Sequence, residues 1–353
     1  MLPKDSVIEL VGPIIREESG RGVIEHAFRI YSALAKTGLH IGKIDAFSPR
    51  QLLSHKFGRL HAKDKDVIYH YLDPSAASVQ FMFKSKPSIV TIHDLDFLDA
   101  HHRSNKFTSY SGGMSTFFTK PEEHLLFYLL RIPSIIGLRQ ALKNEDHFIF
   151  VSDLTMRDFV KRFKVDSDKC HVIPPIVGDR FRPLKKHRKS DVVIGHISSY
   201  SRSKNAGVLI RAFKKVHNKN YELHLGGGVM PYKINDDPRI KRLGFLPSAE
   251  LPAVFNSFDV FVFPSTWEGF GMPVMEAKKC KVPVITYAKG NLPDIVKRNT
   301  LQFKDEKDLV RILEGEKWRD VDVDKAYEDV KICEEKNVVR EIIKVYGQAL
   351  SHK

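Results

Sequence analysis

The stretch FVFPSTWEGFGMPVMEAKKCKVPVI, residues 261–285, passes from an apolar run through a glycine-rich link into a second apolar run. The first run predicts a buried strand, and Pro273 suits the first position of a helix, which would place Glu276 in the first helical turn. The apolar residues 282–285 predict the next strand. A strand, a helix and a second strand in direct succession indicate a parallel α/β sheet.

The same alternation of short β-branched runs and amphipathic stretches extends over most of the chain. Strands are expected within residues 7–12, 41–47, 66–72, 88–94, 147–152, 191–197, 221–228, 239–246 and 259–265. Residues 171–191 carry prolines and a basic cluster without a sustained period, and we interpret them as the end of one domain and a linker.

The predicted fold class is therefore α/β, with two Rossmann-like doubly wound domains facing a cleft. The expected N-terminal domain covers residues 1–183, and the expected C-terminal domain covers residues 184–336. A final amphipathic helix, residues 337–353, is expected to pack back toward the N-terminal domain. Domains of this kind bind their ligands at the carboxyl ends of the strands.

Composition limits the classes of protein that the chain can belong to. Of its 353 residues, 42% are apolar and 28% charged, as in a soluble globular protein, and no run approaches the ~18 apolar residues of a spanning helix. No signal peptide is visible, and Cys170, Cys280 and Cys333 offer no disulfide framework, which fits a reducing cytoplasm. The net charge of +14 could attract nucleic acid, anionic lipid or a phosphorylated small molecule, but no nucleic-acid motif accompanies it.

The glycine-rich link has the chemistry of a ligand site. Its glycines let backbone N–H groups approach a ligand closely, and the helix that follows favours an anion at its N-terminus. Glu268 and Glu276 add two carboxylates, which suit a phosphate joined to hydroxyl-rich groups. Paired carboxylates also serve glycosidases, so the link alone leaves a hydrolase open.

The segment EGFGMPVME resembles the Glu-x7-Glu motif of retaining glycosyltransferases with the GT-B fold, a family that includes mannosyl- and glucosyltransferases. LGFLPSAELPAVFNSFDVFVFPS before the motif and KVPVITYAKGNLPDIV after it are similar to the family as well. FIFVSDLTMRDF and CHVIPPIVGDRFRP resemble its domain-closing segments. The resemblance covers most of the chain and is most specific between residues 240 and 296.

The resemblance implies a role for each residue of the motif. Glu276 would bind the ribose hydroxyls of a nucleotide-sugar donor, and Glu268 would lie beside the transferred sugar. The backbone amides of the four residues between them would hold sugar and phosphate; these are Gly269, Phe270, Gly271 and Met272.

Three further segments resemble parts of the same site. SSYSRSKNAGVLIRAF is similar to the family's diphosphate clamp, in which Lys204 takes the place of the lysine. The clamp arginine would be Arg202, since the alternative position holds Ser198. Gly20 and Gly22 resemble the glycine loop of the first domain, and His93 takes the place of a histidine near the transferred sugar.

The implied activity is transfer of a glucose- or mannose-type hexose from a UDP- or GDP-linked donor to a glycan or lipid-linked glycan, with retention of anomeric configuration. No cofactor is expected, and no acidic pair suited to a metal is seen, so cationic side chains would replace the metal. Family habit adds a peripheral membrane contact at the cytoplasmic face, with residues 97–139 near acceptor or membrane. The alternatives are a glycoside hydrolase or phosphorylase that uses the glutamate pair, and a non-catalytic sugar- or nucleic-acid-binding protein.

Overall fold

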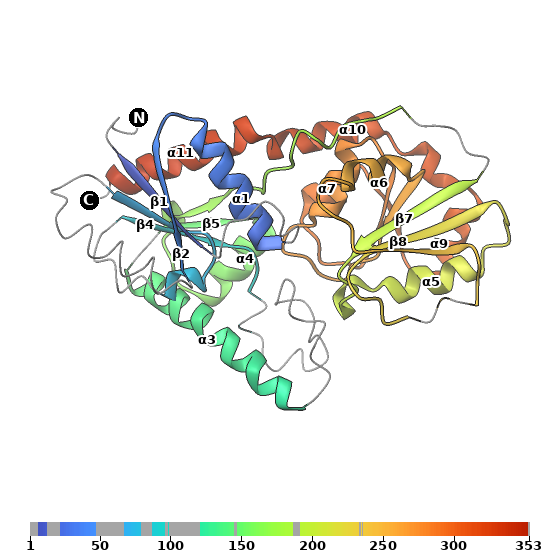
Figure 1. The fold of residues 1–353 in the computed structure, drawn as a ribbon, viewed down its shortest axis with the longest axis horizontal. Helices are drawn as coiled ribbons and strands as arrows, with labels where there is room; N and C mark the ends of the chain where they lie inside the picture. The colour runs from blue at the N-terminus through green and yellow to red at the C-terminus, as the bar shows by residue number, and fades with distance from the viewer. Residues whose placement is uncertain are drawn as a thin grey trace. The chain divides into compact units, whose positions relative to one another are not determined.

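The computed structural model describes residues 6–12, 22–46, 67–78, 87–95, 98, 121–144, 147–185, 191–232, 234 and 236–351, with the side chains of 45 and 121–131 excepted. The chain divides into two compact units (Figure 1). The first comprises residues 1–102, 117–176 and 335–353, and the second comprises residues 103–116 and 177–334. The sequence places these boundaries at 183/184 and 336/337.

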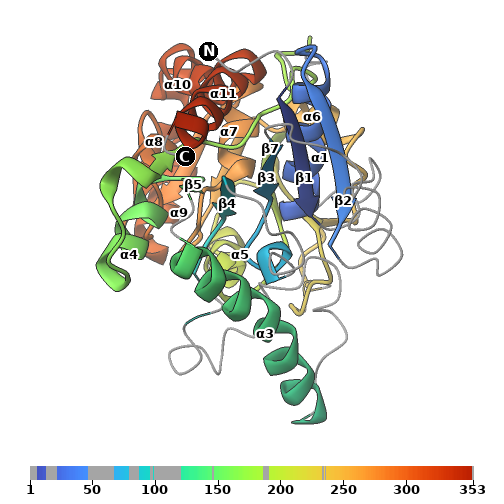
Figure 2. The same ribbon diagram turned by 90° about the vertical axis from the view of Figure 1, so that its left-hand side faces the viewer.

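The first unit contains a parallel sheet with the strand order β2-β1-β3-β4-β5-β6 (Figure 2). Its strands are β1 (Val7–Gly12), β2 (His40–Asp45), β3 (Val67–Tyr71), β4 (Ser88–Ile92), β5 (His147–Phe150) and β6 (Cys170–Val172). The order reverses between β1 and β3, where a doubly wound sheet places its ligand site.

Helices cover both faces of this first sheet. They are α1 (Gly22–Ala35), α3 (Pro121–Asn144), α4 (Asp153–Arg162), the 3₁₀ turn η4 (Ser167–Lys169) and α11 (Glu335–Ser351). Ile149 of β5 packs in one core with α1 and α11, whereas its neighbours Phe148 and Phe150 turn to the other face and contact Phe159 of α4. This alternation is the period of two that a strand imposes on its side chains.

The C-terminal helix α11 belongs to the first unit, although the whole second unit precedes it in the chain. Val338, Ile342 and Val345 join the core that β1 and α1 form. The Tyr346 hydroxyl lies 2.8 Å from Nδ1 of the buried His70 on β3, and the Thr91 hydroxyl lies 2.8 Å from the other ring nitrogen. Both nitrogens of a buried imidazole are thereby satisfied.

The second unit contains a parallel sheet with the strand order β12-β11-β10-β7-β8-β9. Its strands are β7 (Val192–Ser198), β8 (Tyr221–Gly227), β9 (Ile240–Gly244), β10 (Val260–Phe263), β11 (Val284–Tyr287) and β12 (Leu301–Phe303). Counted from β7, this is the order 3-2-1-4-5-6 of dinucleotide-binding domains, which reverses between β7 and β10.

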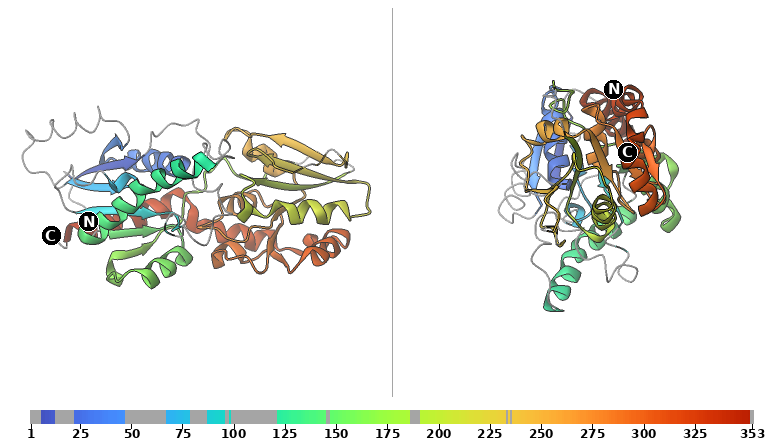
Figure 3. Two further views of the ribbon diagram at one scale, coloured as in Figure 1. Left: turned by 90° about the horizontal axis from the view of Figure 1, so that it is seen from below. Right: turned by 90° about the vertical axis from the view of Figure 1, so that its right-hand side faces the viewer.

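Helices cover both faces of the second sheet too. They are α5 (Ala206–Lys214), α6 (Leu251–Ser257), α7 (Met272–Lys279), α8 (Asp294–Lys297), α9 (Glu306–Glu314) and α10 (Val323–Asp329), with 3₁₀ turns η5 (Arg202–Lys204), η6 (Lys317–Asp320) and η7 (Val330–Cys333). α5 and α9 lie side by side (Figure 3) and bury Leu209, Phe213 and Leu309 in one core. α6 contacts α7, and Phe255 of α6 packs on Phe261 of β10. Two doubly wound α/β domains are thus confirmed.

Candidate active site

Two loops meet where the order of the second sheet reverses. One follows β7 and leads through η5 into α5, and the other follows β10 and leads into α7. β7 and β10 are paired in parallel, with Val260 opposite Ile194, so their carboxyl ends lie next to each other. The reversal leaves both loops at the carboxyl ends of the strands, where α/β domains bind ligands.

Lys204 and Glu268 form an ion pair between these two loops. The Lys204 ammonium donates to both carboxylate oxygens of Glu268, each at 2.7 Å. Their side chains are 21% and 10% exposed, respectively. A cation at the start of α5 would oppose the helix dipole, and the Glu268 carboxylate compensates the charge.

Hydrogen bonds to backbone carbonyls hold the two loops together around this pair. The Thr266 amide and hydroxyl both donate to the Ser203 carbonyl, at 2.8 and 3.1 Å. The side-chain amide of Asn205 donates to the Pro264 carbonyl at 3.3 Å, and Asn205 takes a left-handed conformation with φ of 51°. The residues that flank Lys204 are therefore fixed from both sides.

The loop that follows β11 supports Glu268 from the other side. The Glu268 amide donates to the Asn291 carbonyl at 3.1 Å, and the Asn291 amide donates to the Thr266 carbonyl at 2.9 Å. Gly290 lets this loop approach closely, since a Cβ atom there would lie 2.5 Å from the Ser265 carbonyl oxygen. No local sequence signal marks Asn291, Ser203 or Thr266, because their contacts join positions far apart in the chain.

The glycine-rich link enters α7 as the sequence predicts, with one change of register. Gly271 precedes the helix with φ of 113°, a conformation that favours glycine, and Met272 is the first helical residue. Phe270 is buried and Gly269 precedes it. The first-turn position expected for Glu276 is wrong, because the helix begins at Met272 and Glu276 is its fifth residue.

Glu276 is 7% exposed, so its side chain is largely buried in α7. Burial, with the Glu276 carboxylate as the next cause, raises the pKa of the Cys280 thiol, one turn further along the helix, to about 12. Glu276 and Glu268 are thus the buried carboxylates of the Glu-x7-Glu segment.

Arg202 does not join Lys204 and Glu268. Its side chain is exposed, in contrast to its neighbour Ser203, which is buried. Ser198, at the alternative arginine position, ends β7 and lies with its hydroxyl 2.8 Å from Nε2 of His196. Burial lowers the pKa of His196 to about 4, so this ring is neutral near neutral pH.

The candidate residues of the first unit lie near the reversal of its own sheet. Gly22 begins α1 with φ of 52°. Gly20 lies outside the described residues, as do residues 97 and 99–120 of the segment 97–139 expected near acceptor or membrane. His93 directly follows β4, and its Nε2 lies 3.0 Å from the Leu72 carbonyl, which follows β3. A carbonyl only accepts, so Nε2 carries the hydrogen.

His93 has a histidine neighbour, His26, that stands in no sequence motif. The His26 ring packs edge-to-face on it with centroids 4.9 Å apart, and burial lowers the pKa of both imidazoles. With Nε2 protonated, neutral His93 keeps Nδ1 as a hydrogen-bond acceptor. His26 lies four residues before Ile30 on α1, so the helical period was the signal that could have placed it on the buried face.

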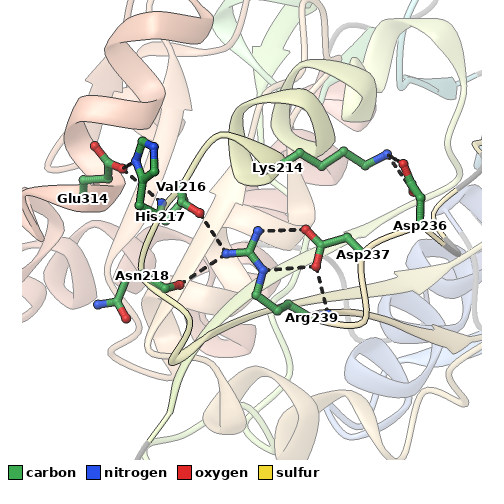
Figure 4. A network of polar contacts seen from close by, with 8 residues as sticks. All are labelled: Lys214, Val216, His217, Asn218, Asp236, Asp237, Arg239 and Glu314. Carbon is green, nitrogen blue, oxygen red and sulfur yellow. Dashed lines mark hydrogen bonds and ion pairs between the residues drawn. The ribbon is translucent and has the colours of Figure 1, made fainter.

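Figure 4 shows a second polar network in the same unit as Lys204. It lies before β8 and β9, at the amino ends of the strands, whereas Lys204 follows the carboxyl end of β7. Arg239 precedes β9, pairs with Asp237, and donates to the Val216 and Asn218 carbonyls at 2.8 and 3.2 Å. These carbonyls belong to the connection from α5 to β8, so the network stabilises turns at the amino ends of strands.

Neither a metal site nor a spanning helix is found among the described residues. In this part of the chain no three His, Cys, Asp or Glu side chains are grouped so that they could hold a metal ion. Likewise, no helix within it is both long and apolar enough to cross a membrane.

Two family models, each matching a different part, together match most of the chain. The model of glycosyl transferases group 1 matches residues 191–314, and that of Glycosyltransferase Family 4 matches residues 46–181. The chain is 23% identical over 343 residues to the O-antigen chain mannosyltransferase B of Escherichia coli. The aligned region covers 86% of this chain and 83% of that protein. It is 27% identical over 184 residues to the D-inositol 3-phosphate glycosyltransferase of Corynebacterium jeikeium, over 44% of each.

Solved structures with the same fold include several glycosyltransferases. Sucrose-phosphate synthase from Thermosynechococcus elongatus has a TM-score of 0.74 at 17% identity and covers 98% of this chain and 100% of that one. Anabaena HepE in complex with UDP and glucose has a TM-score of 0.67 at 14% identity, with coverage of 97% and 99%. WaaG, a glycosyltransferase of lipopolysaccharide biosynthesis, has a TM-score of 0.57. At these identities the likeness shows the fold.

Proposed function

The chain belongs to the glycosyl transferases of group 1 with the GT-B fold, and we propose that it transfers a glucose- or mannose-type hexose from a nucleotide-sugar to a glycan or lipid-linked glycan. The observation that carries this proposal is the Lys204–Glu268 ion pair at the reversal of the second sheet. It joins a cation suited to a diphosphate with a carboxylate suited to sugar hydroxyls, at the edge where such sheets bind nucleotides.

Lys204 is the group that would stabilise the leaving diphosphate. Its ammonium has three donors, and both contacts to Glu268 are at 2.7 Å, so the side chain is already held in place before a phosphate arrives. A fixed cation close to developing negative charge contributes more than one that must reorganise. Glu268 would then keep one oxygen for Lys204 and offer the other to a sugar hydroxyl.

The start of α7 would hold the rest of the donor. Amides from Gly269 to Met272 lie before and within the first turn, where backbone N–H groups and the helix dipole favour a phosphate. Glu276, with two acceptor oxygens, would accept hydrogen bonds from two vicinal ribose hydroxyls. Among the structural neighbours, HepE was solved with UDP and glucose, and we carry a UDP- or GDP-linked donor over to this chain as part of the proposal.

The proposed transfer retains the anomeric configuration and uses no metal. The acceptor hydroxyl attacks the anomeric carbon on the face from which the phosphate leaves, and its proton passes to the departing phosphate oxygen. His93, with Nδ1 as an acceptor, would orient a hydroxyl of the transferred sugar. We place this reaction at the cytoplasmic face of a membrane, on the strength of the basic charge and the family resemblance.

The pairing of Glu268 favours a transferase over a glycosidase. A retaining glycosidase needs one carboxylate as a nucleophile and a second as an acid, about 5 Å apart. Both oxygens of Glu268 instead accept from Lys204, which lowers the nucleophilicity of the carboxylate. A glycosidase would also have no use for a lysine directed at a leaving phosphate.

The proposal is tested with UDP- and GDP-linked glucose and mannose, each offered with a panel of glycan acceptors. Release of nucleoside diphosphate identifies the donor, and proton NMR coupling gives the anomeric configuration of the product. We expect an α product from an α-linked donor, and activity that persists in excess chelator. A β product contradicts retention, and loss of activity that manganese restores contradicts the metal-free clamp. Hydrolysis of a glycoside without any nucleotide contradicts the transferase itself.

A further inference from the structure

The chain passes between its two units at two places in its described part, after Ile176 and after Glu334. On the side of the second unit these crossings are bonded to each other, because the Val177 amide donates to the Cys333 carbonyl at 2.9 Å. The two chain segments that connect the units are therefore hydrogen-bonded to each other on the side of the second unit.

Two consecutive backbone carbonyls at the first crossing each accept a hydrogen bond from a cationic side chain, one from each unit. The Arg29 guanidinium on α1 donates to the Ile176 carbonyl at 2.7 Å. The Lys279 ammonium on α7 donates to the next carbonyl, that of Val177, at 2.8 Å, and to the Asp179 carboxylate at 2.8 Å. The boundary between the two units falls between these two carbonyls.

Lys279 is buried and Arg29 is largely shielded from water, so each charge needs compensating contacts inside its unit. The side chains of Arg29 and Lys279 are 10% and 8% exposed. Taking a charge out of water is unfavourable unless the charge is paired, and apolar residues of similar volume often stabilise a core more. Arg29 is paired with Glu25 on its own helix, yet it also reaches the crossing.

The helices that bear Arg29 and Lys279, α1 and α7, also bear candidate site residues. α1 begins at Gly22 and bears His26, whose ring packs on His93. α7 follows the link that contains Glu268, and it bears Glu276 three residues before Lys279. In each unit, therefore, one cation on the helix that carries candidate site residues donates a hydrogen bond to the crossing.

We propose that Arg29 and Lys279 are positioning residues that fix the path of the chain between the units relative to the site helix of each unit. The inference rests on the proposed function, in which the two units supply different parts of one transfer reaction. Without these two hydrogen bonds, the carbonyls on either side of the boundary would no longer be held to α1 and α7.

Lys278 offers a matched control for Lys279. It is its neighbour on α7, and its side chain is 0% exposed, so Lys278→Met and Lys279→Met each remove one buried ammonium from the same helix. The partners of Lys278 all lie within the second unit, away from the crossing; they are the carbonyls of Ile295 and Arg298 and the carboxylate of Asp329. An effect that both variants share is due to loss of a buried ammonium. An effect seen only in Lys279→Met is due to loss of its hydrogen bond to the crossing.

The test measures the distance between the units in the full-length chain without ligand. Dyes are attached through Val160→Cys on α4 and Lys307→Cys on α9, both exposed, after Cys170→Ser removes the one cysteine that is not buried. Single-molecule energy transfer should give a broader distance distribution in Arg29→Met and Lys279→Met than in Lys278→Met. Equal widths in Lys279→Met and Lys278→Met would overturn the inference. If Lys279→Met does not fold, Arg29→Met decides in the same way.

Kinetics separate this inference from the proposed function. With the donor that the sugar-nucleotide panel identifies, kcat/KM should fall roughly 3–30-fold in Arg29→Met and Lys279→Met, as for other changes in coupling elements, and less in Lys278→Met. If kcat/KM falls as much or more in Lys278→Met, the effect does not come from the hydrogen bonds to the crossing. A starting protein that turns over no nucleotide-sugar contradicts the proposed function alone, since the ligand-free distance distributions still decide the role of the two cations.

Discussion

Lys204 and Glu268 lie 64 positions apart in the chain, and the ammonium of one is 2.7 Å from both carboxylate oxygens of the other. The contact exists because β7 and β10 are neighbours in the second sheet although β8 and β9 lie between them in sequence. A reversal of strand order thus builds a charged pair at the edge of the sheet where nucleotides bind.

The first prediction concerns the two cations of the expected diphosphate clamp. Lys204→Met should lower kcat by roughly 10²–10³-fold, the range for removal of a preorganised group that stabilises leaving-group charge. Arg202→Met should have a much smaller effect, because Arg202 is exposed and lies outside the ion pair. Release of nucleoside diphosphate at saturating donor measures both. A larger loss in Arg202→Met would move the clamp from Lys204 to Arg202.

The second prediction concerns Glu276 and the ribose. Glu276→Gln keeps the shape of a side chain that is 7% exposed and removes its charge, so the fold should persist. Weaker hydrogen bonds to the ribose hydroxyls should cost roughly 1.5–3 kcal/mol of donor affinity, as for bonds to charged groups. Calorimetry with the donor's nucleoside diphosphate measures the loss, and a 2′-deoxyribose analogue is the control. An unchanged affinity would remove Glu276 from the ribose role.

The third prediction concerns the entry into α7. Gly271 has φ of 113° and ψ of 47°, and a Cβ atom there would lie 3.1 Å from Cγ1 of Val296. Gly271→Ala should therefore lower the free energy of unfolding by roughly 1–3 kcal/mol. Gly244→Ala is the control, with φ of 71° and no atom within 4 Å of its Cβ. Urea unfolding measures both, and equal losses would show that the contact with Val296 has no effect.

The fourth prediction concerns acid. Burial lowers the pKa of His70 to about 3 and that of His196 to about 4, below the ~6.5 of an exposed histidine. Between pH 6.5 and 4 the unfolded chain binds more protons than the folded one, so the free energy of unfolding should fall as pH falls through this window. His196→Gln keeps a donor and an acceptor but cannot titrate, so its loss of stability between pH 7 and 4 should be smaller. An equal loss in the variant would contradict neutral His196 in the folded protein.

The periodic pattern of the sequence was enough to predict most strands and the start of α7, because short β-branched runs and a helical period are local signals. It did not predict β6 (Cys170–Val172), which is short and runs directly into prolines. It also does not predict β12, α8, α9 or α10, since the sequence assigns the segment 294–334 only to the second domain as a whole.

Pairing within the site was harder to predict than its members. Lys204 and Glu268 each stood in a recognisable motif, but their ion pair depends on the order of strands in the sheet, which no local pattern contains. His26 carried no motif at all, and only its place on the buried face of α1 connects it with His93. Glu276 lies one position beyond the expected first turn because the helix starts at Met272, before the proline.

The central claim is that a nucleoside diphosphate binds at the Lys204–Glu268 pair, and calorimetric titration of UDP and GDP tests it most directly. Lys214→Met is the matched control, since Lys214 also pairs with an acidic residue, Asp236, but outside the two loops that carry Lys204 and Glu268. We predict saturable binding of one of the two nucleotides to the starting protein and to Lys214→Met, and a loss of roughly tenfold or more in affinity in Lys204→Met. Equal affinity in all three proteins, or no binding to the starting protein, would contradict the account.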